Sequence, residues 1–138
     1  MDNLQRASVS LLIDEDDLVP SEITALLGAE PRLGVAKGEK FLGSHGKCTE
    51  ASTGKWQLGG DWNTPVDLND QISTLLARLT DDLEVWKYLT ARYHCYMSVG
   101  GYFVDWTGGI TLAPQTLGAL SARGLAIDFD LYAHTASE

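Results

Sequence analysis

The sequence predicts an α+β fold, in which a single two-layer domain spanning residues 1–138 packs three or four helices on one face of a mainly antiparallel sheet of about four to six strands. Residues 7–13 are rich in β-branched and aliphatic side chains, and residues 125–132 alternate apolar with polar side chains, as strands do. Residues 68–79 repeat leucine and isoleucine at helical spacing. Segments 18–26 and 112–120 also share leucine, proline and aliphatic positions, so we expect pseudo-duplicated strand–helix modules with a ferredoxin-like character.

The N-terminal third is predicted to form one strand–helix module. After the strand at 7–13, Pro20 is suited to the first turn of a helix that runs to Leu27, and Gly28 is suited to end it. Between them lies the acidic run 14–17. We expect this run to be a solvated loop rather than a calcium site, because no glycine or downstream glutamate completes a calcium loop.

Residues 30–53 are rich in glycine and lysine, and we expect a hairpin-like connection with at most short strands. Glycine beside lysine is also typical of phosphate-binding loops. The phosphate-loop spacing fails, however, because Phe41 stands where the first glycine is needed and Cys48 follows Lys47. Residues 54–58 then predict a strand with Trp56 and Leu58 on one face, and residues 59–61 predict the turn that ends it.

Residues 64–79 and 81–93 predict either two helices that meet near Thr80, with Thr64 and Asp81 as their N-caps, or one helix with a bend there. In the second helix the apolar stripe is expected to include Leu83. A strand over 94–104 follows, with a possible bulge at residues 100–101, and residues 105–109 form a turn. The chain closes with a β-α-β unit over 110–132, in which a short apolar run is expected to be a strand, followed by a proline-led helix and a final strand.

Composition narrows the class of protein. A chain of 138 residues with 44% hydrophobic side chains can bury a core without disulfides or a structural metal. No window approaches the roughly 18–20 apolar residues of a membrane span, and the first residues do not resemble a signal peptide. Only two cysteines occur, which favours a reducing compartment, so we expect a cytoplasmic protein.

The net charge of −9 disfavours nucleic acid and membrane surfaces as partners, because both repel an acidic protein at long range. The charge is uneven. Residues 32–55 hold five of the ten basic side chains against two acidic ones, a net +3, which leaves −12 for the rest of the chain. This basic segment is a candidate site for an anionic ligand.

Three stretches are similar to a known family. They are residues 27–31 after the first helix, residues 54–58 around Trp56, and the closing unit over 112–132. Taken together they resemble the bacterial family known as domain of unknown function 4279. The resemblance implies a small α+β fold and a bacterial cytoplasmic origin. It implies no activity and no catalytic residue. The glycine- and lysine-rich stretch over 34–53 departs from the pattern expected of the family.

Local motifs for catalysis or metal binding are missing from the sequence. No nucleophile elbow, zinc-protease helix or dinucleotide fingerprint occurs. Two histidines and two cysteines, His45 with Cys48 and His94 with Cys95, contain the ligand types of a zinc site. Adjacent residues of a strand point to opposite faces, however, so we expect His94 and Cys95 not to share an ion. We therefore expect no metal, no cofactor and no catalytic residue.

The remaining candidates for a function are aromatic and basic. Trp62 and Trp106 are predicted in turns, where an exposed indole can anchor a partner or cap the core. The candidate binding residues are Lys37, Lys40, Lys47, Lys55, Trp56, Trp62 and Trp106. They favour a non-catalytic binding or interaction module, whose partner is a protein or a small anionic ligand. Size and acidity also suit an immunity-like protein that neutralises a basic toxin. The alternatives are a small enzyme acting on an anionic metabolite and a structural homodimer without a ligand.

Overall fold

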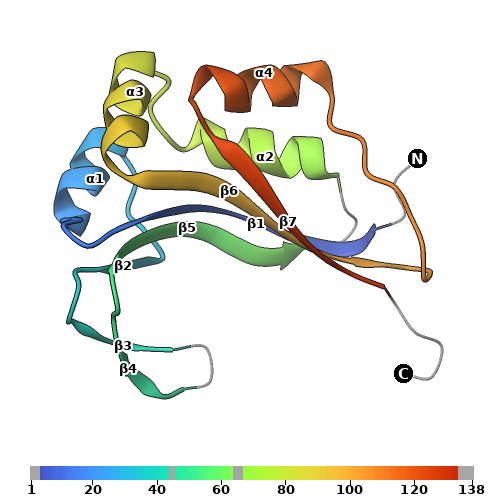
Figure 1. The fold of residues 1–138 in the computed structure, drawn as a ribbon. Helices are drawn as coiled ribbons and strands as arrows, with labels where there is room; N and C mark the ends of the chain where they lie inside the picture. The colour runs from blue at the N-terminus through green and yellow to red at the C-terminus, as the bar shows by residue number, and fades with distance from the viewer. Residues whose placement is uncertain (1–3, 44–45, 64–66, 134–138) are drawn as a thin grey trace.

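A five-stranded sheet forms one layer of the molecule and helices form the other (Figure 1). The computed structural model describes residues 4–43, 46–63 and 67–133. The strands of the main sheet are β1 (Leu4–Glu15), β2 (Leu33–Val35), β5 (Gly54–Asn63), β6 (His94–Phe103) and β7 (Ala126–Tyr132), in the order β2-β5-β1-β6-β7. A two-stranded sheet holds β3 (Lys40–Leu42) and β4 (Cys48–Glu50). The helices are α1 (Pro20–Leu27), α2 (Leu68–Ala77), α3 (Leu83–Arg92) and α4 (Pro114–Ala122).

The predicted fold class is confirmed, since the sheet is mainly antiparallel and the helices lie on one side of it. Central strand β1 pairs antiparallel with both β5 and β6, and only β7 runs parallel to its neighbour β6. The strand before α1 therefore has no parallel partner, whereas α4 connects the parallel pair β6 and β7. The two proline-led segments resemble each other in sequence but do not form repeated modules.

The apolar run over 110–113 is not the strand that the sequence predicted. Asn69 of α2 occupies its backbone groups instead: the side chain donates to the carbonyl of Thr111 at 2.9 Å and accepts from the amide of Ala113 at 2.8 Å. The same Oδ1 accepts from the hydroxyl of Thr116 at 2.6 Å. The Asn69 side chain therefore forms the backbone hydrogen bonds that a neighbouring strand would form if this segment were part of a sheet. The segment is held against α2 and leads directly into α4.

The core lies between the sheet and the helices. On β1, alternate residues Ala7, Val9, Leu11 and Ile13 are buried, as a half-covered strand requires. They meet side chains from β5, β6 and all four helices, which are Ile23, Leu27, Trp56, Leu58, Leu68, Ile72, Leu75, Trp86, Leu89, Met97, Val99 and Leu120. Trp56 and Leu58 therefore share the core face, as predicted.

Gly59 and Gly60 do not end β5 with a turn, which corrects the prediction for residues 59–61. The strand continues to Asn63, and its pairing with β1 shifts between Ser8 and Ser10. Ser10 pairs with Gly59 and Ser8 pairs with Trp62. Between these two pairs β5 advances by three residues while β1 advances by two, so β5 contains one extra residue. This is a β-bulge, and its glycines have φ of 91° and 98°. Glycine adopts such angles without strain, and the strand is therefore kinked rather than ended.

Both predicted helix starts are displaced. The N-cap of α2 is Asp67, whose carboxylate accepts from the amide of Asp70 at 3.2 Å. The predicted cap, Thr64, lies outside the described residues. The N-cap of α3 is Asp82 rather than Asp81, and it accepts from the amide of Glu84 at 3.0 Å. Leu83 is therefore the first residue of α3 and is exposed, not part of the buried stripe.

Other elements match the predictions more closely. Helix α1 has Pro20 in its first turn and ends at Gly28, which has φ of 81°. Residues 30–53 contain three short strands, two of which, β3 and β4, form a hairpin. The bulge that the sequence suggested at residues 100–101 is not found, since β6 pairs evenly with β1 through Gly100 and Gly101. The irregularity lies instead in β1, between Leu4 and Arg6. Among the described residues, no helix combines the length and apolar character needed to cross a bilayer.

Candidate binding surface on the uncovered face of the sheet

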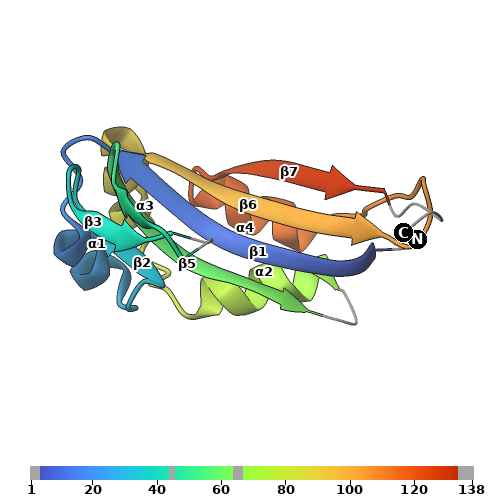
Figure 2. The same ribbon diagram turned by 90° about the horizontal axis from the view of Figure 1, so that it is seen from below.

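The face of the main sheet opposite the helices is largely uncovered. Seen from that side, β7, β6, β1 and β5 lie in front of the helices, and the β3–β4 hairpin covers one end (Figure 2). Four side chains from four adjacent strands meet on this face. They are Trp62 of β5, Arg6 of β1, Tyr102 of β6 and Tyr132 of β7, and we call them the aromatic–arginine strip.

The strip is a continuous set of ring contacts. The rings of Trp62 and Tyr102 have centroids 5.5 Å apart, and those of Tyr102 and Tyr132 are stacked at 5.2 Å with an angle of 25°. The guanidinium carbon of Arg6 lies 5.1 Å from the Trp62 ring centroid and 4.5 Å from that of Tyr102. Cation–π contacts of this kind hold an arginine in place while its donors stay available.

The β-bulge at Gly59 determines which face Trp62 occupies. Trp56, Leu58 and Trp62 all have even numbers, so an unbroken strand would place all three on the core face. The extra residue reverses the alternation beyond Gly60, and Trp62 then lies opposite Ser8 on the uncovered face. Gly100 of β6 gives the indole room, because a Cβ atom there would lie only 3.2 Å from the Trp62 ring.

Acidic side chains flank the strip. Asp128 and Asp130 of β7 are exposed on the same face, and the hydroxyl of Tyr132 donates to Asp130 at 2.9 Å. This bond, together with the negative charge of Asp130, raises the pKa of Tyr132. Farther along the face, Asp14 lies 3.4 Å from Nδ1 of His94. Phosphate groups would meet several carboxylates here, which is unfavourable.

A second hollow lies between the hairpin and the sheet, and we call it the hairpin cavity. It has a volume of about 470 Å³, and its lining includes Lys55, Arg32, Phe41 and Gln57. The ammonium of Lys55 lies 5.9 Å from the Phe41 ring centroid. Arg32 donates to the carbonyl of Gly59 at 3.1 Å and to Asp61 at 3.3 Å. The cavity therefore combines two cations with apolar and amide groups.

The seven predicted binding residues do not form one site. Lys40 and Lys47 are exposed on or beside the hairpin, and Lys55 lines the hairpin cavity. Lys37 instead lies 3.2 Å from Asp16, whose pKa is lowered by hydrogen bonds from Thr53 and Lys37.

The tryptophans are also separated. Trp56 is fully buried, and its indole N–H donates to the hydroxyl of Thr24 at 3.0 Å, so its contacts are those of a core residue. Trp106 lies after β6 and is 81% exposed. Trp62 is 48% exposed and lies in a strand, not in the predicted turn. Of the seven residues, Trp62 alone belongs to the aromatic–arginine strip.

Sequence reasoning missed Arg6, Tyr102 and Tyr132. A signal for the tyrosines exists in the alternation of their strands. In β6 the buried residues Cys95, Met97 and Val99 alternate with residues that include Tyr102, which assigns Tyr102 to the opposite face. What the sequence does not show is that β6 and β7 are neighbours, which brings Tyr102 opposite Tyr132.

Cys95 and Cys48, two of the candidate zinc ligands, lie on different strands of the fold, β6 and β4. Cys95 is buried on the core face, and burial raises the pKa of its thiol to about 12. Cys48 is exposed in the hairpin. His45 and His134 lie outside the described residues. Within the described residues, no cluster of three or more His, Cys, Asp or Glu side chains is placed to hold a metal ion.

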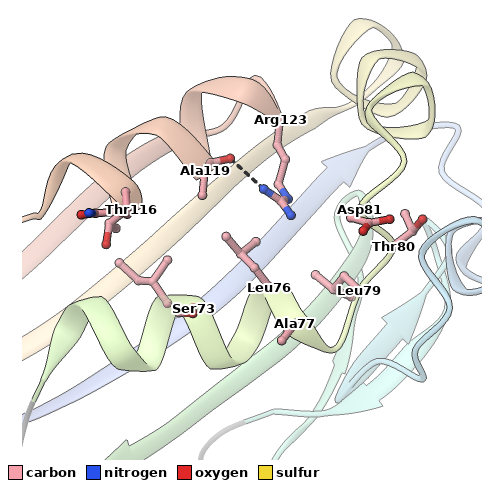
Figure 3. Close-up of a pocket in the computed structure, with 11 residues that line it drawn as sticks. Ser73, Leu76, Ala77, Leu79, Thr80, Asp81, Thr116, Ala119 and Arg123 are labelled. Atoms are coloured by element: carbon pink, nitrogen blue, oxygen red, sulfur yellow. Dashed lines mark hydrogen bonds between the residues drawn. The ribbon is translucent and has the colours of Figure 1, made fainter.

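A further cavity of about 470 Å³ lies between α2 and α4 (Figure 3). Arg123 projects into it from the end of α4, and its Nη1 donates to the carbonyl of Ala119 at 3.0 Å. The guanidinium carbon also lies 6.0 Å from the Trp86 ring centroid. These contacts tie Arg123 to its own helix and to the core, while its buried Nε has no hydrogen-bond partner among the described residues.

Comparison with known proteins places the chain in a family. Residues 5–134 match the model of a domain of unknown function, DUF4279. No curated protein and no solved structure matches the chain. Since the family model spans nearly all of the sequence, this chain belongs to the family of domain of unknown function 4279.

Proposed function

We propose that the protein is a non-catalytic interaction module that binds a protein partner across the uncovered face of its sheet. The observation that carries the proposal is the aromatic–arginine strip. In it, one arginine and three aromatic side chains from four strands contact one another on the uncovered face of the sheet. Tryptophan, tyrosine and arginine are the residues that most often dominate the binding energy of protein interfaces.

The strip is held ready for binding. Its side chains stand on hydrogen-bonded strands, and mutual stacking restricts their rotamers, so little conformational entropy remains to be lost on association. Trp62 and Tyr132 are about half exposed, which leaves apolar area to bury. Asp128, Asp130 and the net charge of −9 favour a basic protein over nucleic acid as the partner. A basic partner is also what an immunity-like role would require.

Matched tryptophan variants test the proposal. The wild-type protein is immobilised, proteins from its host cell are captured, and the captured set is quantified by mass spectrometry. We expect a partner that is retained by wild type and lost with Trp62→Ala, because a desolvated aromatic anchor is removed. Trp106→Ala is the control, since that indole is also exposed but lies outside the strip. Melting temperatures of both variants verify that they are folded.

Two results would contradict the proposal. One is a partner that Trp62→Ala and Tyr102→Ala still retain while Trp106→Ala loses it. The other is a stable dimer in sedimentation velocity that Trp62→Ala converts to monomer, since the strip would then join two copies of this chain rather than a different protein.

A second candidate function is binding of a small anionic ligand in the hairpin cavity. Its support is the presence of Lys55 and Arg32 in the lining of one hollow of about 470 Å³, a size suited to a small metabolite. A small enzyme acting on such a metabolite would use the same cavity. A thermal-shift screen of phosphate- and carboxylate-bearing metabolites tests it, with Lys55→Ala expected to abolish any stabilisation that wild type shows.

A further inference from the structure

Strand β7 is an edge strand with one unpaired side. It pairs in parallel with β6 through all seven of its residues, and in the described part of the chain no strand pairs with its other side. An open edge presents backbone N–H and C=O groups that an added strand can bond. Figure 1 shows β7 at the front of the sheet.

On the core side of the sheet, the second half of β7 borders an apolar groove of about 520 Å³. The groove is lined by Phe103, Gly108, Ile110, Leu112, Phe129 and Leu131. Phe129 is 42% exposed, although it pairs with the fully buried Val99 in the register of the sheet. The wall of the groove opposite β7 includes Ile110 and Leu112. Hydrogen bonds from Asn69 to the backbone of residues 111 and 113 hold this wall in position. Helix α4 thus leaves part of the apolar face of β7 uncovered.

On the other side of the sheet, the same strand is acidic. Asp128 and Asp130 alternate with Phe129 and Leu131 and are exposed, and β7 contains no basic residue. A segment added to the edge would place its side chains alternately beside the apolar groove and beside these carboxylates, because side chains alternate along any strand. The edge therefore has a chemical pattern with a period of two residues.

We propose that the free edge of β7 binds an extended segment of a protein partner in which apolar and basic residues alternate. Its apolar side chains enter the groove beside Phe129 and Leu131, and its lysines or arginines face Asp128 and Asp130. The inference rests on the proposed function, because it specifies the kind of segment that this interaction module binds. The basic side chains would lie next to Tyr132, so the edge is continuous with the aromatic–arginine strip.

A second copy of this chain fits the edge poorly. If two β7 strands paired antiparallel about Phe129, Asp128 of each copy would stand opposite Asp130 of the other. Like charges directly opposite each other on paired strands are destabilising. Carboxylates on an edge strand are also a recognised means of preventing self-pairing. Charge thus disfavours a copy of this chain and favours a basic segment.

The probe is a fluorescent heptapeptide of the length of β7, Lys-Val-Lys-Val-Lys-Val-Lys, with blocked ends, measured by anisotropy against the full chain. Two further peptides are compared with it. Lys-Lys-Val-Val-Val-Lys-Lys keeps the composition without the alternation, and Glu-Val-Glu-Val-Glu-Val-Glu reverses the charge. We expect the alternating basic peptide to bind about tenfold or more tightly than either, since both faces of the edge are then matched.

Protein variants locate the binding. Asp128→Asn with Asp130→Asn should weaken it roughly 2- to 30-fold, the range for two partly exposed ion pairs. Glu30→Gln with Glu50→Gln, which changes the net charge equally on exposed residues outside β7, should leave it unchanged. Phe129→Ser should weaken binding about tenfold or more, whereas Leu117→Ser, on the exposed surface of α4, should not.

Equal binding of the alternating and block peptides would overturn the inference, as would full affinity in the double asparagine variant. So would a dimer in sedimentation velocity that Phe129→Ser separates, because the groove would then hold a second copy. The proposed function is judged separately by partner capture with Trp62→Ala. If a captured partner depends on Trp62 but no peptide binds β7, the inference about the β7 edge is refuted, whereas the proposed binding through the aromatic–arginine strip is retained.

Discussion

A Cβ atom on Gly59 would lie 2.5 Å from the backbone oxygen of Val9, on the neighbouring strand. No side chain fits that gap, and the φ of 91° at Gly59 is itself unfavourable for any other residue. Gly59 begins the bulge that moves Trp62 from the core face of β5 to the uncovered face. One glycine therefore links the packing of β5 against β1 to the composition of the candidate binding surface.

Replacing Gly59 with alanine should destabilise the fold by at least about 1–3 kcal/mol, because the backbone must adopt a strained conformation and also move away from Val9. Chemical denaturation measures the change. Gly118→Ala is the matched control. It lies inside α4 with nothing within 4 Å of its added Cβ, so it should stabilise the protein by about 0.4–1 kcal/mol. A Gly59→Ala protein as stable as wild type would mean that the bulge tolerates a side chain.

The sequence predicted the elements of this fold better than their connections. Helix α1 was placed correctly because proline and glycine mark its ends, and the burial of Trp56 and Leu58 followed from simple alternation. The Gly59–Gly60 pair predicts a turn, but glycines with positive φ occur in β-bulges as well as in turns. Only the position of β1 beside β5 distinguishes them, and that is a long-range contact.

The candidate site shows the same limit. Trp62 was singled out, but its neighbours Arg6, Tyr102 and Tyr132 come from strands that are distant in sequence, and only the strand order brings them together. The lysines were grouped because they are close in the sequence, yet Lys37 pairs with Asp16 while Lys55 faces Phe41. Closeness in sequence therefore does not make these lysines one site.

Truncating leucines to alanine should show that the two proline-led segments contribute differently to stability. Leu120 is 3% exposed, so Leu120→Ala should cost about 2–5 kcal/mol by opening a cavity. Leu26, at the matching position of the first segment, is only partly buried against the core, and Leu26→Ala should cost less than about 2 kcal/mol. Leu117→Ala, at a half-exposed position, should change stability by less than about 0.5 kcal/mol. Denaturant titration of the three variants gives the ranking, and a Leu26 loss equal to that of Leu120 would refute it.

The two thiols should differ in reactivity. Burial raises the pKa of Cys95 from 9.0 to about 12, and since the thiolate is the nucleophile, native Cys95 should remain unmodified by iodoacetamide at pH 8. Cys48 is exposed and should be alkylated. Mass spectrometry of Cys48→Ser measures this directly, because the variant should gain a label only after unfolding. Rapid labelling of the folded variant would show that Cys95 is accessible.

Charge reversal on the hairpin distinguishes recognition from scaffolding. Lys40 is exposed and stands opposite Glu50 in the hairpin register, and Lys47 is exposed beside β4. Exposed ion pairs contribute about 0–1 kcal/mol, so Lys40→Glu with Lys47→Glu should leave the melting temperature nearly unchanged.

The binding readouts of the same double variant then identify the ligand class. A small anion held near the hairpin should bind much more weakly, and the loss should diminish as salt is added, because charges beyond about 8 Å are screened at physiological ionic strength. A protein partner bound through the aromatic–arginine strip should be affected less by the lysine reversal than by Trp62→Ala, since desolvated aromatic anchors outweigh exposed charges. If the double reversal instead lowers the melting temperature by many degrees, the hairpin lysines stabilise the acidic body of the protein, and recognition by the hairpin is refuted.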